Sequence, residues 1–211
     1  MVSGHYSGSR GDYIKFKVED VPRFTIDQAV RHEVGVFKNV QSLRYVGKNS
    51  FAYEIPVDII GNEELVDKYI AHMNNTLALY EEIQEYVFDM THSNERANEQ
   101  ARYVLPMATH SAFIIGFTVE AFIHFMNMRL CVRAEDKIRE MALLMKKAVI
   151  EEFPDRALAN RLVPNCQALL WCPEGKHSCD AYPTKAGLKE IIDEYKKIID
   201  EYKELKSKEE E

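Results

Sequence analysis

Residues 31–46 read RHEVGVFKNVQSLRYV, and this stretch largely determines how the N-terminal part of the chain is expected to fold. A helix is predicted from about Arg23 into the start of the stretch, where Gly35 ends it. Beyond it, Ser42 to Tyr53 is expected to be extended. Upstream, Tyr13 to Val18 alternates apolar and lysine side chains, as a half-buried strand does. The sequence therefore predicts a strand–helix–strand unit with a polar segment at its turn.

The same stretch carries side chains that suit an oxyanion such as phosphate: Arg31, His32, Ser42 and Arg44. Arginine presents a planar fork of donors, while Ser, His and backbone N–H groups add directional hydrogen bonds. Gly35 would allow close approach of the backbone to a ligand. The alternative interpretation is a surface turn whose charges face water.

The bulk composition describes a soluble globular protein. The chain has 211 residues, of which 46% are hydrophobic and 29% charged, and a formal net charge of −7. This charge argues against a broad nucleic-acid-binding surface, although a local arginine cluster can still bind a small anion. No apolar run has the length of a membrane span and no signal-peptide pattern is present, so we expect a cytoplasmic protein without a membrane partner.

Several further helices follow from the apolar periodicity. They are expected at residues 63–89, 95–103 and 134–150, the last ending at Phe153-Pro154, and residues 108–127 are rich in apolar side chains. A seven-residue repeat, Ile191–Lys197 and Ile198–Glu204, predicts a C-terminal helix with one apolar seam. That helix either docks on a neighbouring subunit or remains a solvated end.

A second group of candidate binding residues lies later in the chain. Arg102 and Arg129 are candidates for anion binding, and Arg129 sits in an otherwise apolar segment, where a buried arginine needs an anionic partner. A structural salt bridge with a glutamate is the alternative for both. His124 and Arg133 flank Arg129, and His124 is also explained as a satisfied core histidine.

The cysteines form a third candidate site. Cys166, Cys172, His177 and Cys179 could complete a tetrahedral zinc site, although the segment has no CxxC pair. Reduced thiols are the alternative. Cys131 is explained as a small buried hydrophobe.

Short motifs, taken in order and spacing, resemble one enzyme family over most of residues 3–180. They are Gly4-His5 with Ser7, Gln28-x-x-Arg31-His32, Gln41-Ser42-Leu43-Arg44-Tyr45-Val46, Ala101-Arg102-Tyr103-Val104-Leu105-Pro106, His124-Phe125, Arg129, Arg133-Ala134 and Ile138-Arg139-Glu140. With them the chain resembles the flavin-dependent thymidylate synthases. This resemblance implies an α+β fold, a small antiparallel sheet packed with long helices, as a single domain over residues 1–185 with a helical tail over 186–211.

The family resemblance also implies an activity. Family members are homotetramers that share active sites between subunits and convert dUMP to dTMP. They take the carbon from methylene-tetrahydrofolate and the hydride from reduced FAD, which NADPH regenerates. The resemblance implies nucleotide binding by Gln28, Arg31, Gln41, Ser42, Leu43, Arg44, Arg102 and Arg129. Arg129 would be the catalytic group, stabilising negative charge on the activated ring, and Arg31, His32, His124 and Arg133 would bind the cofactor.

The departures from the family pattern fall on its flavin side. Glu33 and Glu120 stand where the family has arginines, Gly11 where it has a histidine, and Phe37 where it has a serine. A carboxylate beside a diphosphate is unfavourable. Three hypotheses follow: a flavin-dependent thymidylate synthase, a flavin-independent, folate-dependent pyrimidine nucleotide hydroxymethylase, or a non-catalytic nucleotide-binding homolog.

Overall fold

The computed structural model describes residues 11–45, 52–154 and 156–209, which belong to two compact units. The first unit runs through Phe122 and the second begins at Ile123, so the boundary falls inside helix α4 (Val119–Arg129). Within the described ranges, the strands lie in the first unit and the second is built from helices. The fold is α+β, as expected, whereas one domain over residues 1–185 stays a prediction.

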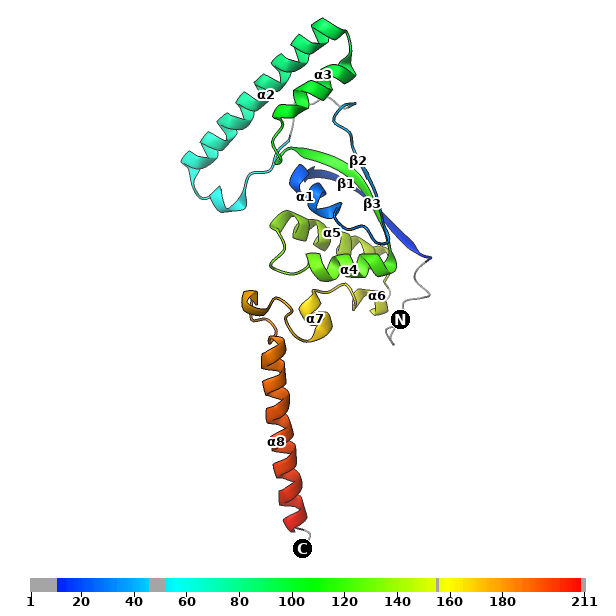
Figure 1. Ribbon diagram of the computed structural model, residues 1–211, viewed down its shortest axis with the longest axis vertical. Helices are drawn as coiled ribbons and strands as arrows, with labels where there is room; N and C mark the ends of the chain where they lie inside the picture. The colour runs from blue at the N-terminus through cyan, green and yellow to red at the C-terminus, as the bar shows by residue number, and fades with distance from the viewer. Residues whose placement is uncertain (1–10, 46–51, 155, 210–211) are drawn as a thin grey trace. The chain divides into compact units, whose positions relative to one another are not determined.

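A three-stranded antiparallel sheet organises the first unit (Figure 1). Strand β3 (His110–Thr118) is central, with β1 (Tyr13–Pro22) on one side and β2 (Val36–Val40) on the other. The register pairs Pro22 with His110, and Val40 with Phe113. Both outer strands therefore end beside the first residues of β3, and this is where the candidate site lies.

The predicted strand–helix–strand order is confirmed, but its second strand was misplaced. Strand β1 includes the predicted strand, and helix α1 (Arg23–Ala29) begins where expected. The extended segment predicted from Ser42 to Tyr53 is wrong over its first residues, because Ser42–Tyr45 forms a turn and β2 precedes it. Gly35, at φ 70°, lets the chain turn directly into β2. Residues 46–51 of the predicted segment lie outside the described ranges.

The apolar segment at residues 108–127 supplies both the central strand and the core. Its first part is β3 and its second part begins α4. The Phe122 ring packs against Phe16 at 5.4 Å and Phe117 at 5.5 Å between ring centroids, and Phe117, Phe122 and Ile115 are fully buried. These contacts hold β1, β3 and the start of α4 together through apolar burial.

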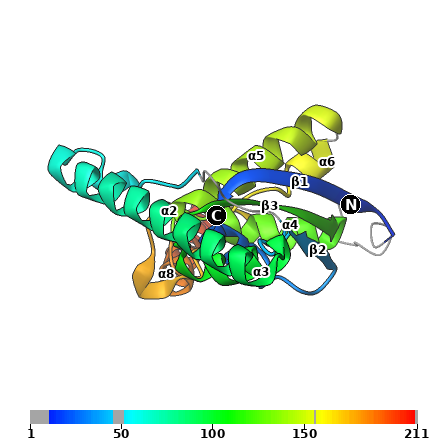
Figure 2. The ribbon, with the colours of Figure 1, turned by 90° about the horizontal axis from the view of Figure 1, so that it is seen from above.

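Two helices of the first unit form an antiparallel pair. Helix α2 (Glu63–Thr91) begins at Asn62, whose side chain accepts a hydrogen bond from the Leu65 N–H, and ends at His92 in the left-handed conformation. Helix α3 (Asn94–Ala101), capped by Ser93, returns beside it in both views (Figures 1 and 2). A short 3-10 turn, η3 (Arg102–Val104), continues α3, and another, η2 (Val57–Ile59), precedes α2. Both predicted helices are confirmed.

The second unit continues from α4 into a series of helices. The predicted helix at residues 134–150 is confirmed as α5 (Asp136–Glu152), with Glu135 as its N-cap. Between α5 and the C-terminal helix lie α6 (Arg156–Ala159), α7 (Asn165–Leu169) and the 3-10 turn η4 (Gly175–His177). The repeat forms α8 (Lys185–Glu209), one continuous helix in Figure 1. In the parts of the chain described, no helix combines the length and apolarity needed to cross a bilayer.

Candidate functional site

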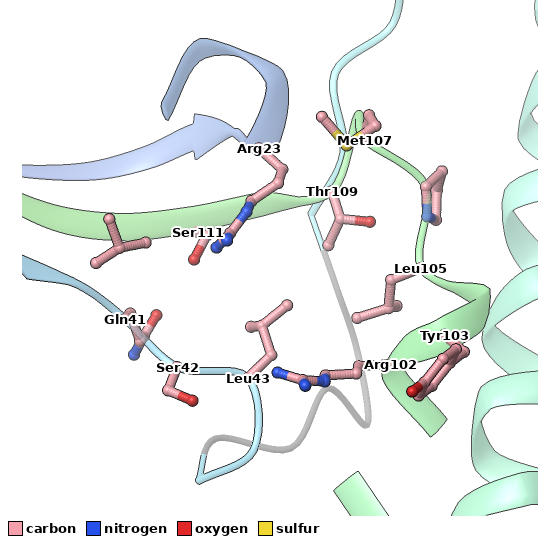
Figure 3. Close-up of a pocket in the computed structure, with 12 residues that line it drawn as sticks. Arg23, Gln41, Ser42, Leu43, Arg102, Tyr103, Leu105, Met107, Thr109 and Ser111 are labelled. Atoms are coloured by element: carbon pink, nitrogen blue, oxygen red, sulfur yellow. The ribbon is translucent and has the colours of Figure 1, made fainter. Parts of the chain in front are cut away.

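A cavity of about 610 Å³ lies in the first unit where the outer strands end beside β3 (Figure 3). Four segments contribute to it: the β1–α1 junction, the turn after β2, the 3-10 turn after α3, and the start of β3 with the loop before it. The lining residues are Arg23, Val40, Gln41, Ser42, Leu43, Arg102, Tyr103, Leu105, Pro106, Met107, Thr109 and Ser111.

Backbone hydrogen bonds fix these segments on the central strand. The Arg23 N–H donates to the Thr109 carbonyl at 3.0 Å, and the Phe24 N–H donates to the Met107 carbonyl at 3.2 Å. On the other edge, the Gln41 N–H donates to the Ala112 carbonyl at 3.0 Å. The cavity is therefore held by the same ladder that builds the sheet, which favours a pre-formed site.

The cavity is positively charged despite the acidic chain. Among its lining residues are two arginines, Arg23 and Arg102, and no carboxylate. Arg23 pairs with Asp27, whose Oδ1 lies 3.7 Å from Arg23 Nε, and Asp27 does not line the cavity. Two guanidinium groups facing one cavity favour an anionic ligand.

Two buried hydroxyls in the cavity wall have unused hydrogen-bonding capacity. Thr109 is 3% exposed and Ser111 is 5% exposed, and neither side-chain oxygen has a hydrogen-bond partner within the described residues. A buried polar atom without a partner costs about 1–3 kcal/mol. A ligand with acceptor oxygens would remove that cost at both positions.

Arg44 holds the turn that carries the cavity residues but does not line the cavity itself. Its guanidinium pairs with Glu95 at 2.6 Å and Glu99 at 3.7 Å, both on α3. Its carbonyl accepts a hydrogen bond from Asn98 Nδ2 at 3.2 Å. In the single chain, Arg44 thus joins the turn after β2 to the helix that precedes Arg102.

The structure brings together part of the predicted nucleotide-binding set. Gln41, Ser42, Leu43 and Arg102 line the cavity, whereas Gln28, Arg31 and Arg44 do not. Among the lining residues that were not predicted from the sequence, Arg23, Thr109 and Ser111 carry hydrogen-bond donors that an anion could use. These residues can be recognised only from the strand register, because the pairing of β1 with β3 places Arg23 beside Thr109.

The predicted flavin-side residues of the first unit lie in the turn between α1 and β2 and at the start of α4. Arg31 and Glu33 are exposed and His32 is half-buried. Lys38 Nζ donates to the Val30 carbonyl and, at 3.2 Å, to the His32 carbonyl, which ties the turn to β2. Glu120 is also exposed. Positions 33 and 120 therefore carry carboxylates that are exposed in this unit.

The remaining predicted residues belong to the second unit. Exposed His124 and half-buried Arg129 lie on α4. Arg133 lines a cavity of about 120 Å³ together with Cys131, Cys166, Cys172 and Cys179. Their assignment to cofactor, substrate and catalysis stays a prediction.

The structure does not support the zinc site predicted at Cys166, Cys172, His177 and Cys179. In the described ranges, no group of three or more His, Cys, Asp or Glu side chains is placed to hold a metal ion. His177 lies in η4 and does not line the cysteine cavity, and all four cysteines are free thiols. Burial, with smaller contributions from the neighbouring cysteines, raises the pKa of the Cys166 thiol. This favours the protonated thiol, whereas zinc binds thiolate.

Comparisons with known proteins are consistent with this geometry. Residues 1–155 match the family model described as thymidylate synthase complementing protein. The flavin-dependent thymidylate synthase of Nitratidesulfovibrio vulgaris is 32% identical over 189 residues, covering 89% of this chain and 76% of the relative. The enzyme of the same name from Thermococcus onnurineus is 30% identical, covering 82% and 69%.

A solved structure supports the fold. The UMP/dUMP methylase PolB from Streptomyces cacaoi, bound with 5-Br UMP, aligns with a TM-score of 0.56 and 21% identity over 77% of each chain. At this identity the likeness concerns the fold.

Proposed function

The chain belongs to the thymidylate synthase complementing protein family, whose relatives here are flavin-dependent thymidylate synthases, and from that premise we propose that it methylates dUMP to dTMP. Methylene-tetrahydrofolate is the proposed carbon donor and reduced FAD, regenerated by NADPH, the proposed hydride donor. We also propose a homotetramer with shared active sites, located in the cytoplasm.

One observation carries the proposal: the segments that resemble the family's nucleotide motifs meet at one positively charged cavity. Gln41, Ser42 and Leu43 come from the turn after β2, and Arg102 comes from the end of α3, about sixty residues later in the chain. Figure 3 shows the Arg102 side chain extending toward Leu43. A phosphate monoester carries about −2 charge at neutral pH, and this is the chemistry that arginine and serine donors recognise.

In the proposed reaction, the chain's residues bind and orient the nucleotide. Arg102 and Ser42 would hold the phosphate, and Gln41 would add amide hydrogen bonds. As the family resemblance implies, Arg129 would stabilise negative charge that develops on the pyrimidine when C5 is activated toward the carbon donor. Fixing the nucleotide before the carbon donor reacts supplies orientation, which is a large part of such catalysis.

The flavin-side residues fit FAD less well than the nucleotide-side residues fit dUMP. FAD would supply a hydride when bound, and Arg31, His32, His124 and Arg133 are the residues proposed to hold it. Glu33 and Glu120 are exposed carboxylates at positions where the family resemblance implies arginines. A carboxylate repels the negatively charged diphosphate of FAD, whereas an arginine at the same position would attract it.

This observation supports a second candidate function, a folate-dependent hydroxymethylase that uses no flavin. In it, C5 of the nucleotide would form a bond to the methylene carbon of the folate. C5 would lose its own proton, and the folate amine would take up a proton and leave, which makes the exocyclic methylene carbon electrophilic. The hydroxyl of water would then bond to that carbon and the remaining proton of the water would be released, so that CH2OH replaces the C5 hydrogen. No hydride and no change in redox state beyond the carbon transfer are needed.

A product assay separates these functions. The purified protein is incubated with dUMP and methylene-tetrahydrofolate, with and without FAD and NADPH, and the nucleotides are separated by liquid chromatography with mass spectrometry. FAD-dependent 5-methyl product supports the first function, and flavin-independent 5-hydroxymethyl product supports the second. Binding of dUMP without either product would contradict both and support a non-catalytic nucleotide-binding protein.

A further inference from the structure

We propose that Arg23, together with the hydroxyls of Ser111 and Thr109, forms a second phosphate-binding wall of the cavity, facing the same nucleotide phosphate as Arg102. The inference rests on the proposed function, because it takes the ligand to be a uridine monophosphate nucleotide. It assigns a role to an arginine that lies outside the motifs of residues 28–46 and 101–106.

Strand register places these three side chains together. Strand β1 ends with Val21 opposite Ser111 and Pro22 opposite His110, and the next N–H, that of Arg23, donates to the Thr109 carbonyl at 3.0 Å. Side chains two residues apart on a strand point to the same face. Thr109, just before β3, and Ser111, on β3, therefore share a face, and Arg23 lies beside Thr109 at the edge of that face.

The hydroxyls of Thr109 and Ser111 are buried and lack hydrogen-bond partners, as expected for groups that bind a ligand. Both residues are more than nine-tenths buried and line the cavity, and neither oxygen has a protein partner among the described residues. A hydroxyl can donate to a phosphate oxygen in hydrogen bonds that are stronger than those between neutral groups. Binding a phosphate here would satisfy two groups that the folded chain leaves unpaired.

Arg23 has a charge that its neighbourhood does not fully neutralise. The recorded ion pair joins Nε to Asp27 Oδ1 at 3.7 Å, longer than a hydrogen bond, and its two side chains are 36% and 44% exposed. Such an exposed pair contributes little. Figure 3 shows the Arg23 side chain extending into the cavity from the β1–α1 junction, while Arg102 enters it from η3.

The other arginines predicted to bind a phosphate do not form part of this cavity wall. Arg31 and Arg44 do not line the cavity, and Arg44 is paired with Glu95 and Glu99. Arg23 is thus the second guanidinium at the cavity, and with Arg102 it supplies two positive charges to a phosphate of about −2.

The test compares two ligands that differ only in the phosphate. Dissociation constants for dUMP and for deoxyuridine are measured by isothermal titration calorimetry on the full chain and on Arg23→Ala, Arg23→Lys, Ser111→Ala and Lys17→Ala. Lys17 is the control, because it removes one positive charge from β1 at an exposed pair with Glu19, away from the cavity lining.

We expect Arg23→Ala to weaken dUMP binding by about 10- to 100-fold, the usual effect of losing a charged hydrogen-bonding partner, and to change deoxyuridine binding by less than about twofold. Arg23→Lys should recover part of the affinity, because it keeps the charge but not the fork. Ser111→Ala should weaken dUMP binding by about 3- to 10-fold, again without affecting deoxyuridine.

Three results would overturn the proposal. Unchanged dUMP affinity in Arg23→Ala removes Arg23 from the site, and an equal loss for both ligands shows that it does not act on the phosphate. If Arg23→Ala does not fold, as judged by circular dichroism, Ser111→Ala decides by the same comparison of ligands. A wild-type chain that binds neither ligand and gives no product overturns the proposed function and this inference together.

Discussion

Arg102 lies at the end of a helix and lines the cavity, where its guanidinium is proposed to bind the phosphate. It follows the last residue of α3, and its backbone N–H donates to the Asn98 carbonyl, so the helix end sets where its side chain begins. We predict that Arg102→Ala raises the KM for dUMP by about 10- to 100-fold, because one charged hydrogen-bonding partner of the phosphate is lost. Steady-state kinetics over a range of dUMP concentrations measure the change.

The control for this prediction is Lys68→Ala, which removes an exposed cation paired with Glu64 on α2. Its KM should equal that of the unmodified chain. An Arg102→Ala protein with a normal melting temperature and a normal KM would show that the phosphate does not bind at this residue.

Cys166 offers a prediction that depends on pH. Burial raises the pKa of its thiol, so at a given pH its reactive thiolate is scarcer than that of an ordinary cysteine. We expect iodoacetamide at about pH 8 to modify exposed Cys179 first and Cys166 later. The Cys166 rate should rise as the pH is increased through its raised pKa. Peptide mass spectrometry over time measures both rates, and faster modification of Cys166 than of Cys179 would contradict this account.

The sequence motifs name residues that share one cavity, but they do not name the partners of those residues that come from elsewhere in the chain. Gln41, Ser42, Leu43 and Arg102 were predicted and share the cavity. The motif predicted Arg44 as a binding residue, but it does not indicate the carboxylates on α3, more than fifty residues later, that pair with Arg44. Arg23 belongs to no motif, and its place depends on the pairing of β1 with β3.

At the scale of elements, the turn between α1 and β2 depends on one glycine. Gly35 adopts φ 70°, and a Cβ there would lie 2.7 Å from Thr118 Oγ1 and 3.0 Å from Ala121 Cβ. That Thr118 hydroxyl accepts a hydrogen bond from the Ala121 N–H at 3.2 Å. We predict that Gly35→Ala lowers the free energy of unfolding by about 2–4 kcal/mol, from backbone strain plus the contact. Urea denaturation followed by circular dichroism measures it.

A second glycine provides the matched control. Gly175 has φ 55°, but a Cβ there would meet nothing within 4 Å. Gly175→Ala should therefore cost only the backbone term, about 1 kcal/mol. Equal losses in the two variants would show that the contact with Thr118 contributes nothing.

Element types were predicted best where length and periodicity agree. The long amphipathic helix α2, with an N-cap at one end and a left-handed residue at the other, is an example. The apolar segment that contains β3 was not resolved into strand and helix, because a short run of buried residues has no periodicity that separates the two. Strand β2 was missed because apolar Phe37 is exposed while Lys38 is half-buried, so its sequence lacks the apolar–polar alternation of a strand.

At the scale of the molecule, the net charge of the chain does not predict the charge of the cavity. The chain carries −7 overall, yet no carboxylate is among the residues lining the larger cavity, where two arginines lie. The acidic side chains near those segments are drawn into other pairs, as Glu95 and Glu99 are by Arg44. The anion site therefore depends on how the fold distributes its charges, which the net charge alone does not predict.

Helix α8 carries an exposed apolar seam that could contact another subunit of the proposed oligomer. Its repeat places Ile191, Tyr195 and Ile198 on one seam, where they are 42%, 64% and 54% exposed. If this seam docks on another copy of the chain, placing charges in it should separate the subunits, because burying an unpaired lysine is unfavourable. We predict that Ile191→Lys combined with Ile198→Lys lowers the molar mass in solution.

Size-exclusion chromatography with light scattering measures this mass, and the helix itself supplies the control. Asp193→Lys combined with Asp200→Lys has the same seven-residue spacing but, by the heptad geometry, lies on the side of the helix opposite the seam. This variant should keep the mass of the unmodified chain, because lysines there remain in water in either state. If both double variants keep that mass, α8 is a solvated end, and contacts of an oligomer must be sought on other surfaces. If both lose it equally, the effect is one of total charge and the seam has no special role.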